Sequence, residues 1–504
     1  MTRDNVVSRI CGEDRPWDVL VIGGGASGFG AALEAASRGH HTLLLEGVDF
    51  GQGTSSRSTK LIHGGVRYLR QGQIGLVRES LRERGLLLKN APHLVRPLGF
   101  VIPCFRWGEK SYYRFGLSLY DRLSGQYRIG HTRGLSKTQT LEQLTGINPE
   151  NLSGGVHYED GQFDDARLII SLFRTLLNQG GQAINHARVT RLVQENDRVC
   201  GVIAQDQINH QEWEIHAKAI VNATGIFSDQ VRKMDEAQAS DIITTSQGIH
   251  LVLPRSFMSG NDAIMIPKTH DGRVLFIIPW HNHLLVGTTD SVRDQPQLEP
   301  LPAAYEIEYL LEYLNRYLAQ SVEPKDILST FAGLRPLIGG PGSGHTSRIS
   351  RDYHLRTSKT GLITLAGGKW TTYRAMGEAA IDEAERVGNL EIRKSVTANL
   401  KLHDDGEELK EIKKQNPKAC GLLHPDYPWS VADVIHAVRN QLAQKVEDVL
   451  SRRIRALPLN ARAAEQMATK TVQTMAEEMN QDNAWIEEQT QSFGSLVKIH
   501  LPNL

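Results

Sequence analysis

Residues 17–46, WDVLVIGGGASGFGAALEAASRGHHTLLLE, contain the pattern that most restricts the fold. An apolar run leads into Gly23, Gly25 and Gly28 at G-x-G-x-x-G spacing, and a second apolar run ends at Glu46. Glycines at this spacing let the backbone approach a pyrophosphate at a helix N-terminus, and the acid accepts ribose hydroxyls. The pattern predicts a dinucleotide-binding β-α-β unit; the alternative is an ordinary β-α-β unit with a tight turn.

The number of such patterns indicates which nucleotide binds. An enzyme that uses both NAD(P)H and a flavin normally needs two dinucleotide sites, and this chain shows one good fingerprint. The glycine-rich run GGPGSG at 339–344 follows no convincing strand, so we interpret it as a loop. Gly225 and Gly368 each lie between an apolar strand and a helix, where one extended cofactor would contact several helix starts. FAD alone is therefore the better interpretation.

The composition excludes several other classes of function. The formal net charge is zero, which argues against general nucleic-acid binding. The four cysteines are far apart and form no C-x-x-C pair, and His281 and His283 have no further ligand set near them in sequence. We expect no metal site and interpret the H-x-H pair as a turn.

The rest of the chain predicts two further structural regions. The short β-branched runs GIHLVLP, RVLFIIPW and HLLVGTTD are typical of an antiparallel sheet. After about residue 400 the pattern becomes helical: Ser430-x-x-Asp433 is a capping box, and apolar residues follow at helical spacing from Val431 to Val449. Asn460 and Asp482 are expected to begin two more helices.

Six motifs occur in order along the chain: VIGGGASG, GTSSRSTKLIHGGVRYL, NATG, GLRPL, SRDY and GGKWTTYR. Together they resemble the FAD-dependent glycerol-3-phosphate dehydrogenase family over about residues 17–390 and, more weakly, through the helical tail. VRKMDEA and SRRIRALPLNARAA are closer to its mitochondrial-type branch. That branch carries an EF-hand extension, but no D-x-[DN]-x-[DN]-G loop occurs here, so we expect no calcium regulation.

The resemblance implies an α/β fold: a glutathione-reductase-like FAD-binding domain, an antiparallel β substrate-binding domain and a C-terminal all-α domain. We expect an N-terminal tail over 1–16 and the two interleaved domains over 17–398, followed by the helical domain over 399–504. Within 17–398, the FAD-binding segments are approximately 17–100, 150–245 and 345–398, and the substrate-binding segments approximately 101–149 and 246–344.

The family oxidises sn-glycerol 3-phosphate to dihydroxyacetone phosphate, reduces FAD and passes electrons to a membrane quinone. The resemblance therefore implies a cytoplasmic enzyme that is peripherally associated with the inner face of the cell membrane; a homodimer is one possibility. Two other enzyme interpretations remain, an oxygen-using glycerol-3-phosphate oxidase and a flavin amine oxidase. A flavin-binding scaffold without turnover is the non-enzymatic alternative.

The resemblance also assigns site residues. Flavin-mediated alcohol oxidation needs a base, and His250 on a predicted strand matches the family's active-site histidine; the alternative is a core histidine. Arg335 matches its catalytic arginine, which is suited to stabilising a developing alkoxide. The substrate-binding residues are expected to be Arg67, Tyr68, Arg351 and Lys369. The cofactor-binding residues are expected to be Gly23, Gly24, Gly25, Ser27, Gly28, Glu46, Thr54, Ser55, Ser58, Lys60, Leu61, His63, Val189, Gly225, Gly368 and Thr371.

The basic segment 53–133 has a local excess of positive charge. It holds 15 Lys and Arg residues against 4 Asp and Glu residues in a neutral chain. Around the GTSSRSTKLIHGGVRYL motif this charge would serve the cofactor and substrate phosphates; the alternative is a solvated basic loop. At 106–130, basic residues mix with aromatic ones, which is compatible with an anionic membrane surface or with an amphipathic helix packed on the domain.

Overall fold

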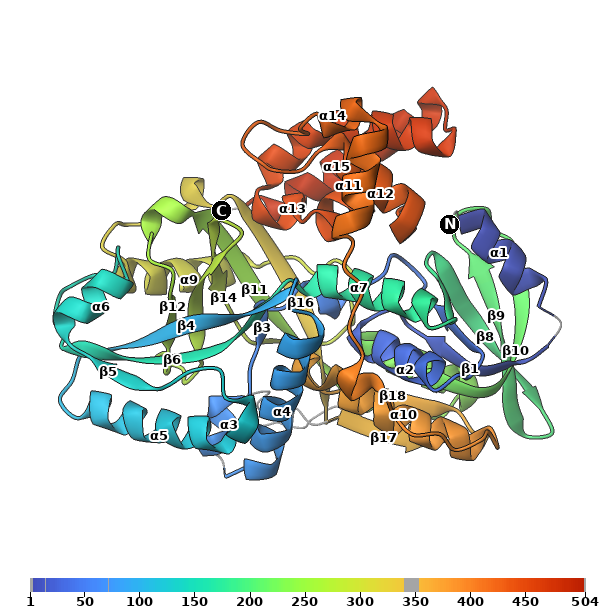
Figure 1. The fold of residues 1–504 in the computed structure, drawn as a ribbon, viewed down its shortest axis with the longest axis horizontal. Helices are drawn as coiled ribbons and strands as arrows, with labels where there is room; N and C mark the ends of the chain where they lie inside the picture. The colour runs from blue at the N-terminus through green and yellow to red at the C-terminus, as the bar shows by residue number, and fades with distance from the viewer. Residues whose placement is uncertain (1–2, 14, 71, 340–352, 503–504) are drawn as a thin grey trace.

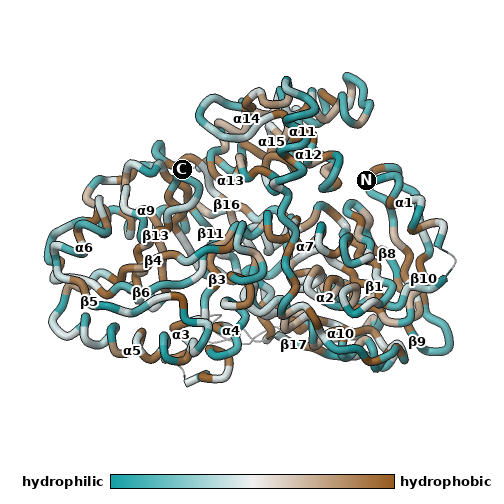
Figure 2. The backbone as a smooth tube through the Cα atoms, viewed as in Figure 1, coloured by the Kyte–Doolittle hydropathy of each residue, from teal (hydrophilic) through white to brown (hydrophobic). Residues whose placement is uncertain are grey.

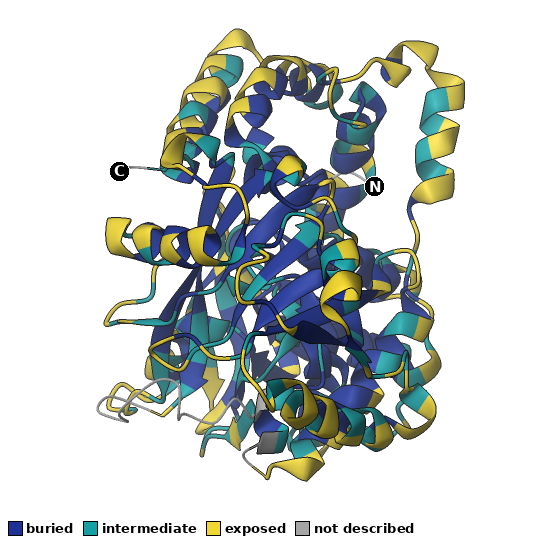
Figure 3. Cartoon of the chain, turned by 90° about the vertical axis from the view of Figure 1, so that its left-hand side faces the viewer, coloured by how far each residue is buried: buried dark blue, intermediate teal, exposed yellow. Residues whose placement is uncertain are grey.

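The computed structural model describes residues 3–13, 15–70, 72–339 and 353–502, and the side chains of Arg67 and Arg70 are not described. Two sheets lie side by side, and a helical domain sits above the junction between them (Figure 1). Hydrophobic residues concentrate along the strands of both sheets (Figure 2), and these strands are largely buried while the outer faces of the helices are exposed (Figure 3).

The first sheet contains the predicted β-α-β unit. Its central strands are parallel, in the order β18–β10–β1–β2–β7, and the edge strand β17 is antiparallel. Helix α2 packs against both α10 and α7. The strands are β1 (Trp17–Ile22), β2 (Thr42–Leu45), β7 (Gln182–Ile184), β10 (Glu212–Asn222), β17 (Tyr353–Thr357), β18 (Ile363–Gly367) and the hairpin β8 (Ala187–Glu195) and β9 (Arg198–Asp206). The helices are α1 (Arg3–Cys11), α2 (Ala26–Ser37), α7 (Asp165–Asn178), α8 (Ser228–Asp235) and α10 (Tyr373–Val387).

The second sheet is antiparallel except where β4 pairs with β12. Its strands are β3 (Leu61–Ile62), β4 (Val95–Cys104), β5 (Arg133–Leu135), β6 (Gly154–Phe163), β11 (Ile243–Pro254), β12 (Ala263–Ile266), β13 (Leu275–Trp280), β14 (His283–Gly287), β15 (Ser291–Arg293) and β16 (Ser329–Ile338). Its helices are α3 (Val66–Arg70), α4 (Ile74–Asn90), α5 (Glu109–Leu123), α6 (Lys137–Gln143) and α9 (Ala304–Tyr317). His281 lies in the turn between β13 and β14, and His283 begins β14.

The C-terminal region is helical, as predicted, with its own buried core. It contains α11 (Gly406–Gln415), α12 (Val431–Gln441), a π-helical turn (Asp448–Arg453), α13 (Ala456–Leu459), α14 (Ala461–Met479) and α15 (Asn483–His500). The Ser430–Asp433 capping box and the helix starts at Asn460 and Asp482 are confirmed. Within the described ranges, none of the helices combines the length and the apolar character needed to cross a bilayer.

Three local expectations differ from the structure. The expected tail contains α1, in which Val6 and Ile10 are buried and Arg3 pairs with Asp206. Strands β3, β4 and β6 belong to the second sheet although segments 17–100 and 150–245 were expected to bind FAD, because β6 pairs with β3 and, along all ten of its residues, with β4. The helical pattern after Val431 does not continue to Val449. Helix α12 ends at Gln441 because Leu442 takes a left-handed conformation with φ +52°.

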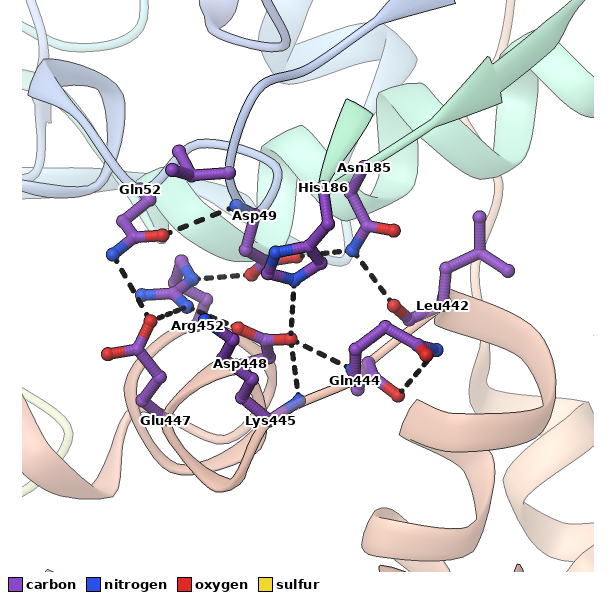
Figure 4. A network of polar contacts seen from close by, with 12 residues as sticks. Asp49, Gln52, Asn185, His186, Leu442, Gln444, Lys445, Glu447, Asp448 and Arg452 are labelled. Carbon is purple, nitrogen blue, oxygen red and sulfur yellow. Dashed lines mark hydrogen bonds and ion pairs between the residues drawn. The ribbon is translucent and has the colours of Figure 1, made fainter. Parts of the chain in front are cut away.

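A buried polar network joins the C-terminal domain to the loop after β2 (Figure 4). Asp49 accepts hydrogen bonds from Arg452, Arg453 and Asn185, and Asp448 pairs with Arg452 and His186. Both carboxylates are fully buried, so their charges require these partners. The C-terminal domain thereby fixes a loop that lies beside the predicted nucleotide site.

Candidate active site

The first of two adjoining cavities lies at the carboxyl ends of the parallel strands. It has a volume of about 530 Å³, and we call it the glycine-turn cavity because Gly23, Gly25 and the helix start at Ala26 line it. Gly23 has φ +109°, and a Cβ there would lie 2.7 Å from the carbonyl oxygen of Ala223. A Cβ on Gly28 would lie 1.8 Å from the carbonyl oxygen of Gly23. The backbone turn therefore requires glycine at both positions, as a close approach to a pyrophosphate does.

Glu46 lies at the end of β2 and lines the same cavity. Its carboxylate accepts hydrogen bonds from the backbone N–H groups of Gly24 and Val48 (2.9 Å for Val48). Burial raises the pKa of this carboxyl group. The carboxylate is thus held against the glycine turn, where its remaining lone pairs suit ribose hydroxyls.

The predicted cofactor residues fall into three groups. The residues that line the glycine-turn cavity are Gly23, Gly25, Ser27, Glu46, Thr54, Ser55, Val189, Gly225 and Gly368. Ser58, Leu61 and His63 instead line the second cavity. Gly24, Gly28 and Thr371 line neither cavity but support their walls; for example, Thr371 Oγ1 donates to the carbonyl oxygen of His63 at 3.3 Å.

Lys60 departs from its predicted role as a cofactor contact. Its side chain is fully buried and lines neither cavity. Its Nζ donates to the carbonyl oxygen of Ser56 at 2.8 Å and to Asp165 at 2.7 Å. Burial lowers the pKa of Lys60 to about 8. The left-handed backbone of Lys60, with φ +61°, turns the side chain into the interior, where Asp165 balances its charge.

The second cavity, which we call the histidine cavity, has a volume of about 600 Å³ and contains His250 in its lining. Both cavities are lined by Thr54, Pro336, Gly368, Lys369 and Trp370. A cofactor in the glycine-turn cavity would therefore present one end to the histidine cavity. The Trp370 indole Nε1 donates to the carbonyl oxygen of Ser55 at 2.9 Å, which holds this shared wall together.

His250 is almost fully buried on β11. Its ring stacks on Phe331 with 4.9 Å between the ring centroids, and its Nε2 lies 3.0 Å from Thr59 Oγ1. Burial, followed by the positive charges of Lys60 and Arg335, holds the pKa of His250 well below its usual value. The imidazole is therefore neutral at neutral pH and has a nitrogen lone pair available to accept a proton.

Arg335 is positioned by the strand pairing between β16 and β11, where it faces Ser246. Its guanidinium donates to Thr288 Oγ1 at 3.0 Å and lies 3.7 Å from the Asp290 carboxylate. The residue lines the histidine cavity and is only half-buried. These contacts hold the positively charged guanidinium of Arg335 near His250, and the guanidinium remains part of the cavity lining.

Two of the four predicted phosphate ligands come together. The Nζ of Lys369 lies 3.9 Å from the centroid of the Tyr68 ring, and both residues line the histidine cavity. Arg67 lies in α3, but its side chain is outside the described part of the structure, as is all of Arg351. The assignment of these two arginines stays a prediction.

Sequence reasoning missed several residues of the histidine cavity. Thr59 contacts His250, and Thr288, Asp290 and Arg273 line the same space. Thr59 lies inside the motif GTSSRSTKLIHGGVRYL, so the sequence could have identified it as a candidate site residue. The other three residues lie in loops next to β13, β14 and β15, and no local sequence pattern places these loops at the cavity.

The comparisons with known proteins agree with this geometry. Residues 18–374 match the family model described as FAD dependent oxidoreductase, and residues 358–486 match the C-terminal domain of alpha-glycerophosphate oxidase. The chain is 36% identical to the mitochondrial glycerol-3-phosphate dehydrogenase of Macaca fascicularis, over 94% of this chain and 72% of that protein. It is 37% identical to the probable mitochondrial enzyme of Caenorhabditis elegans, over 96% and 73% respectively.

The chain belongs to the FAD-dependent glycerol-3-phosphate dehydrogenase family. A solved structure of glycerol-3-phosphate dehydrogenase from Bacillus halodurans, complexed with FAD, matches with a TM-score of 0.80 and 27% identity, covering 100% of this chain and 98% of that one. The predicted fold class, an FAD-binding domain with a C-terminal helical domain, is confirmed. The chain is thus a flavin-dependent oxidoreductase of this family, with FAD as its cofactor.

Proposed function

We propose that this enzyme oxidises sn-glycerol 3-phosphate to dihydroxyacetone phosphate and passes the electrons to a membrane quinone. The observation that carries the proposal is the histidine cavity. A neutral His250, the cationic Arg335 and the pair of Lys369 and Tyr68 all line one space that adjoins the glycine-turn cavity. The names of the relatives and of the solved structure support the choice of substrate.

Each of these residues has a distinct task in the proposed reaction. Bound FAD supplies the acceptor, at N5, for the hydride that leaves the substrate carbon. His250 accepts the proton of the substrate hydroxyl, because its neutral ring has a free lone pair. Arg335 stabilises the negative charge that develops on that oxygen as the proton leaves. Lys369 supplies a point charge, and Tyr68 a hydroxyl, that suit the substrate phosphate.

An anaerobic titration tests the proposal directly. Glycerol 3-phosphate should bleach the visible band of the bound flavin in the absence of any other acceptor. Glycerol, which has no phosphate for Lys369 and Tyr68 to hold, should bleach it far more slowly at the same concentration. A flavin that stays oxidised with glycerol 3-phosphate would exclude the dehydrogenase and leave a flavin-binding scaffold.

The electron acceptor has one competing candidate. The family model that matches residues 358–486 is named for alpha-glycerophosphate oxidase, which favours oxygen as an alternative acceptor. The two are separated by stopped-flow mixing of the reduced enzyme with a soluble quinone analogue or with oxygenated buffer. We expect rapid reoxidation by the quinone and slow formation of peroxide; rapid peroxide formation would make the enzyme an oxidase.

The location at the membrane is proposed from the surface of α5. Trp107 is fully exposed, and Phe115 and Tyr112 are 77% and 63% exposed. Tyr112, Phe115 and Leu119 recur at helical spacing, so they project from one side of α5. The exposed basic residues of the same segment are Arg106, Lys110, Arg114, Arg122 and Arg128. A surface segment that carries both exposed aromatic and exposed basic side chains suits the interface of an anionic bilayer.

Vesicle flotation tests this surface. The protein should float with anionic vesicles, stay behind with neutral ones, and be released by high salt or carbonate. Trp107→Ser combined with Phe115→Ser should weaken flotation, whereas Ile392→Ser, which alters an equally exposed apolar residue elsewhere, should not. Flotation that the double variant leaves unchanged would show that α5 is not the contacting surface.

A further inference from the structure

The chain between β3 and α3 forms one wall of the histidine cavity, and a hydrogen bond supports this wall on the side that faces away from the cavity. His63, Gly65, Val66 and Tyr68 line the cavity. Gly64, between them, turns its backbone N–H away and donates it to the hydroxyl of Tyr120 on α5 at 2.7 Å. Tyr120 is fully buried and lines neither the histidine cavity nor the glycine-turn cavity. One phenol thus supports the wall without reaching the space where the substrate would bind.

The Tyr120 hydroxyl is itself oriented by a buried ion pair. It donates to Asp160 Oδ2 at 2.7 Å, and Asp160 Oδ1 accepts from Arg84 Nη1 at 2.9 Å. Arg84 also donates to the carbonyl oxygen of Tyr127 at 3.1 Å. Burial, followed by the charge of Asp160, raises the pKa of Tyr120 well above its usual value, so the hydroxyl keeps its proton. The direction of every hydrogen bond from Gly64 to Asp160 is therefore fixed.

Sterics leave the wall little freedom. A Cβ on Gly64 would lie 2.6 Å from the Tyr120 hydroxyl oxygen and 2.5 Å from Leu81 Cδ2. Gly65 has φ +78°, and a Cβ there would lie 2.3 Å from Tyr68 Cδ2. The Gly64–Gly65 backbone is therefore enclosed between Tyr120 on one side and the Tyr68 ring on the other. A displacement of this backbone displaces Tyr68, and with it the ring against which Lys369 lies.

We propose that Tyr120 is a positioning residue for substrate binding, which holds the His63–Tyr68 wall so that Tyr68 and Lys369 face the substrate phosphate together. The proposal rests on the proposed function for the identity of the substrate. It assigns the effect to one hydroxyl group, which can be removed without changing the packing of the ring.

Tyr120→Phe tests the proposal in the FAD-loaded enzyme. It leaves the buried N–H of Gly64 without an acceptor, and such a loss corresponds to about fivefold to hundredfold in an equilibrium constant. Stopped-flow flavin reduction over a range of glycerol 3-phosphate concentrations should show a raised dissociation constant, by at most that factor, because the wall relaxes in the free enzyme and must be reordered on binding. The limiting reduction rate should change much less, because His250 and Arg335 are untouched. FAD content should equal that of the wild type.

Two further variants separate positioning from stability. Tyr112→Phe alters an exposed tyrosine of the same helix and should leave the dissociation constant unchanged. Asp160→Asn keeps an acceptor for the Tyr120 hydroxyl but breaks the buried ion pair with Arg84, so it should lower the melting temperature more than Tyr120→Phe does. A Tyr120→Phe enzyme with a lower melting temperature and the wild-type dissociation constant would overturn the proposal, because the hydroxyl would then serve only the fold.

Hydrogen exchange gives a readout that needs no substrate turnover. In the resting holoenzyme, the peptide covering residues 61–69 should exchange faster in Tyr120→Phe than in the wild type, while a peptide from α2 is unchanged. An unchanged exchange rate at 61–69 overturns the proposal even if the enzyme proves inactive towards glycerol 3-phosphate. If residues 61–69 exchange faster in Tyr120→Phe but glycerol 3-phosphate does not bleach the wild-type flavin, the proposed function is refuted and the positioning role of Tyr120 is not.

Discussion

The two adjoining cavities are built from different parts of the polypeptide. The glycine-turn cavity is shaped by main-chain turns where β1, β10 and β18 end, and its critical positions are glycines that a methyl group would block. The histidine cavity is shaped by side chains from antiparallel strands, among them His250 on β11 and Arg335 on β16. The function of the glycine-turn cavity depends on backbone conformation, and that of the histidine cavity depends on the chemistry of its side chains.

This difference separates binding of the cofactor from reaction of the substrate. A side chain added in the glycine turn overlaps main-chain atoms, which cannot move without disturbing the sheet. A side chain removed from the histidine cavity leaves the strand pairing intact, because β11 and β16 pair through their backbones. Substitutions in the glycine-turn cavity should therefore weaken FAD binding, whereas substitutions in the histidine cavity should impair the reaction of the substrate.

The most complete loss of function is expected in the glycine turn, because an enzyme molecule without FAD cannot oxidise the substrate at all. Gly28→Ala places a Cβ 1.8 Å from the Gly23 carbonyl oxygen, so the turn must open and its fit to a pyrophosphate is lost. Overpacking of this kind typically costs about 1–3 kcal/mol, so FAD affinity should fall by about fivefold to 100-fold. The flavin-to-protein absorbance ratio of the purified variant measures the loss.

Gly494→Ala serves as the control, because a Cβ there meets no atom within 4 Å. It should retain full flavin content. If Gly28→Ala also stays yellow and saturated with FAD, the turn is not the pyrophosphate site, and the contrast between the two cavities fails at its first point.

The second effect belongs to the histidine cavity and should leave FAD bound. His250→Ala removes the proposed base, and loss of a general base typically slows proton transfer by about 10²–10⁴-fold. The limiting rate of flavin reduction, measured by stopped flow, should fall by that factor. His281→Ala, which alters a half-exposed turn histidine, should react like the wild type. A His250→Ala enzyme with the wild-type reduction rate would assign proton removal to another group.

The same contrast explains what the sequence could predict. The glycine turn lies within 30 consecutive residues, so its spacing, strand and terminal acid are visible together. The histidine cavity forms only when β11 pairs with β16 and when Lys369 contacts Tyr68. Lys369 and Tyr68 are about 300 residues apart in the sequence. Only the family resemblance placed those residues, and the side chain of Arg67 and the whole of Arg351 lie outside the described part of the structure.

The failures have physical causes of their own. The basic motif suggested that Lys60 contacts the cofactor, but its αL backbone turns the side chain towards Asp165. The helical spacing after Val431 concealed the left-handed Leu442, because apolar periodicity does not register a change of backbone conformation. Tyr120 carried no signal at all in the sequence, since its role depends on Gly64 and Asp160, which are distant in the chain.

The third prediction concerns the phosphate end of the histidine cavity. Lys369→Met keeps much of the side-chain length but removes the charge beside Tyr68. Removing one member of a buried charge pair typically costs at least about 2 kcal/mol, so kcat/KM for glycerol 3-phosphate should fall by about 30-fold or more. The same variant should change kcat/KM for glycerol little. An equal loss for both substrates would show that Lys369 serves the flavin or the fold rather than the phosphate.

The smallest effect is a shift in pH dependence that connects the buried Lys60 to the chemistry. The positive charges of Lys60 and Arg335 add to burial in lowering the pKa of His250. A lowered pKa keeps the base neutral at pH values where an ordinary histidine, with a pKa of about 6.5, is already protonated. The wild-type kcat/KM should therefore persist below that pH and fall only in more acidic solution.

Lys60→Gln removes one of the two positive charges and leaves Asp165 paired with Arg455 at 3.0 Å. The pKa of His250 should rise towards its usual value, so the loss of activity on acidification should begin at a higher pH than in the wild type. The ratio of the two kcat/KM profiles measures the shift, because ionisation of the substrate phosphate affects both enzymes equally. Lys60→Arg, which keeps the charge, should follow the wild type. If Lys60→Gln and the wild type lose activity at the same pH, the base that titrates is not His250, or the charge of Lys60 does not reach it.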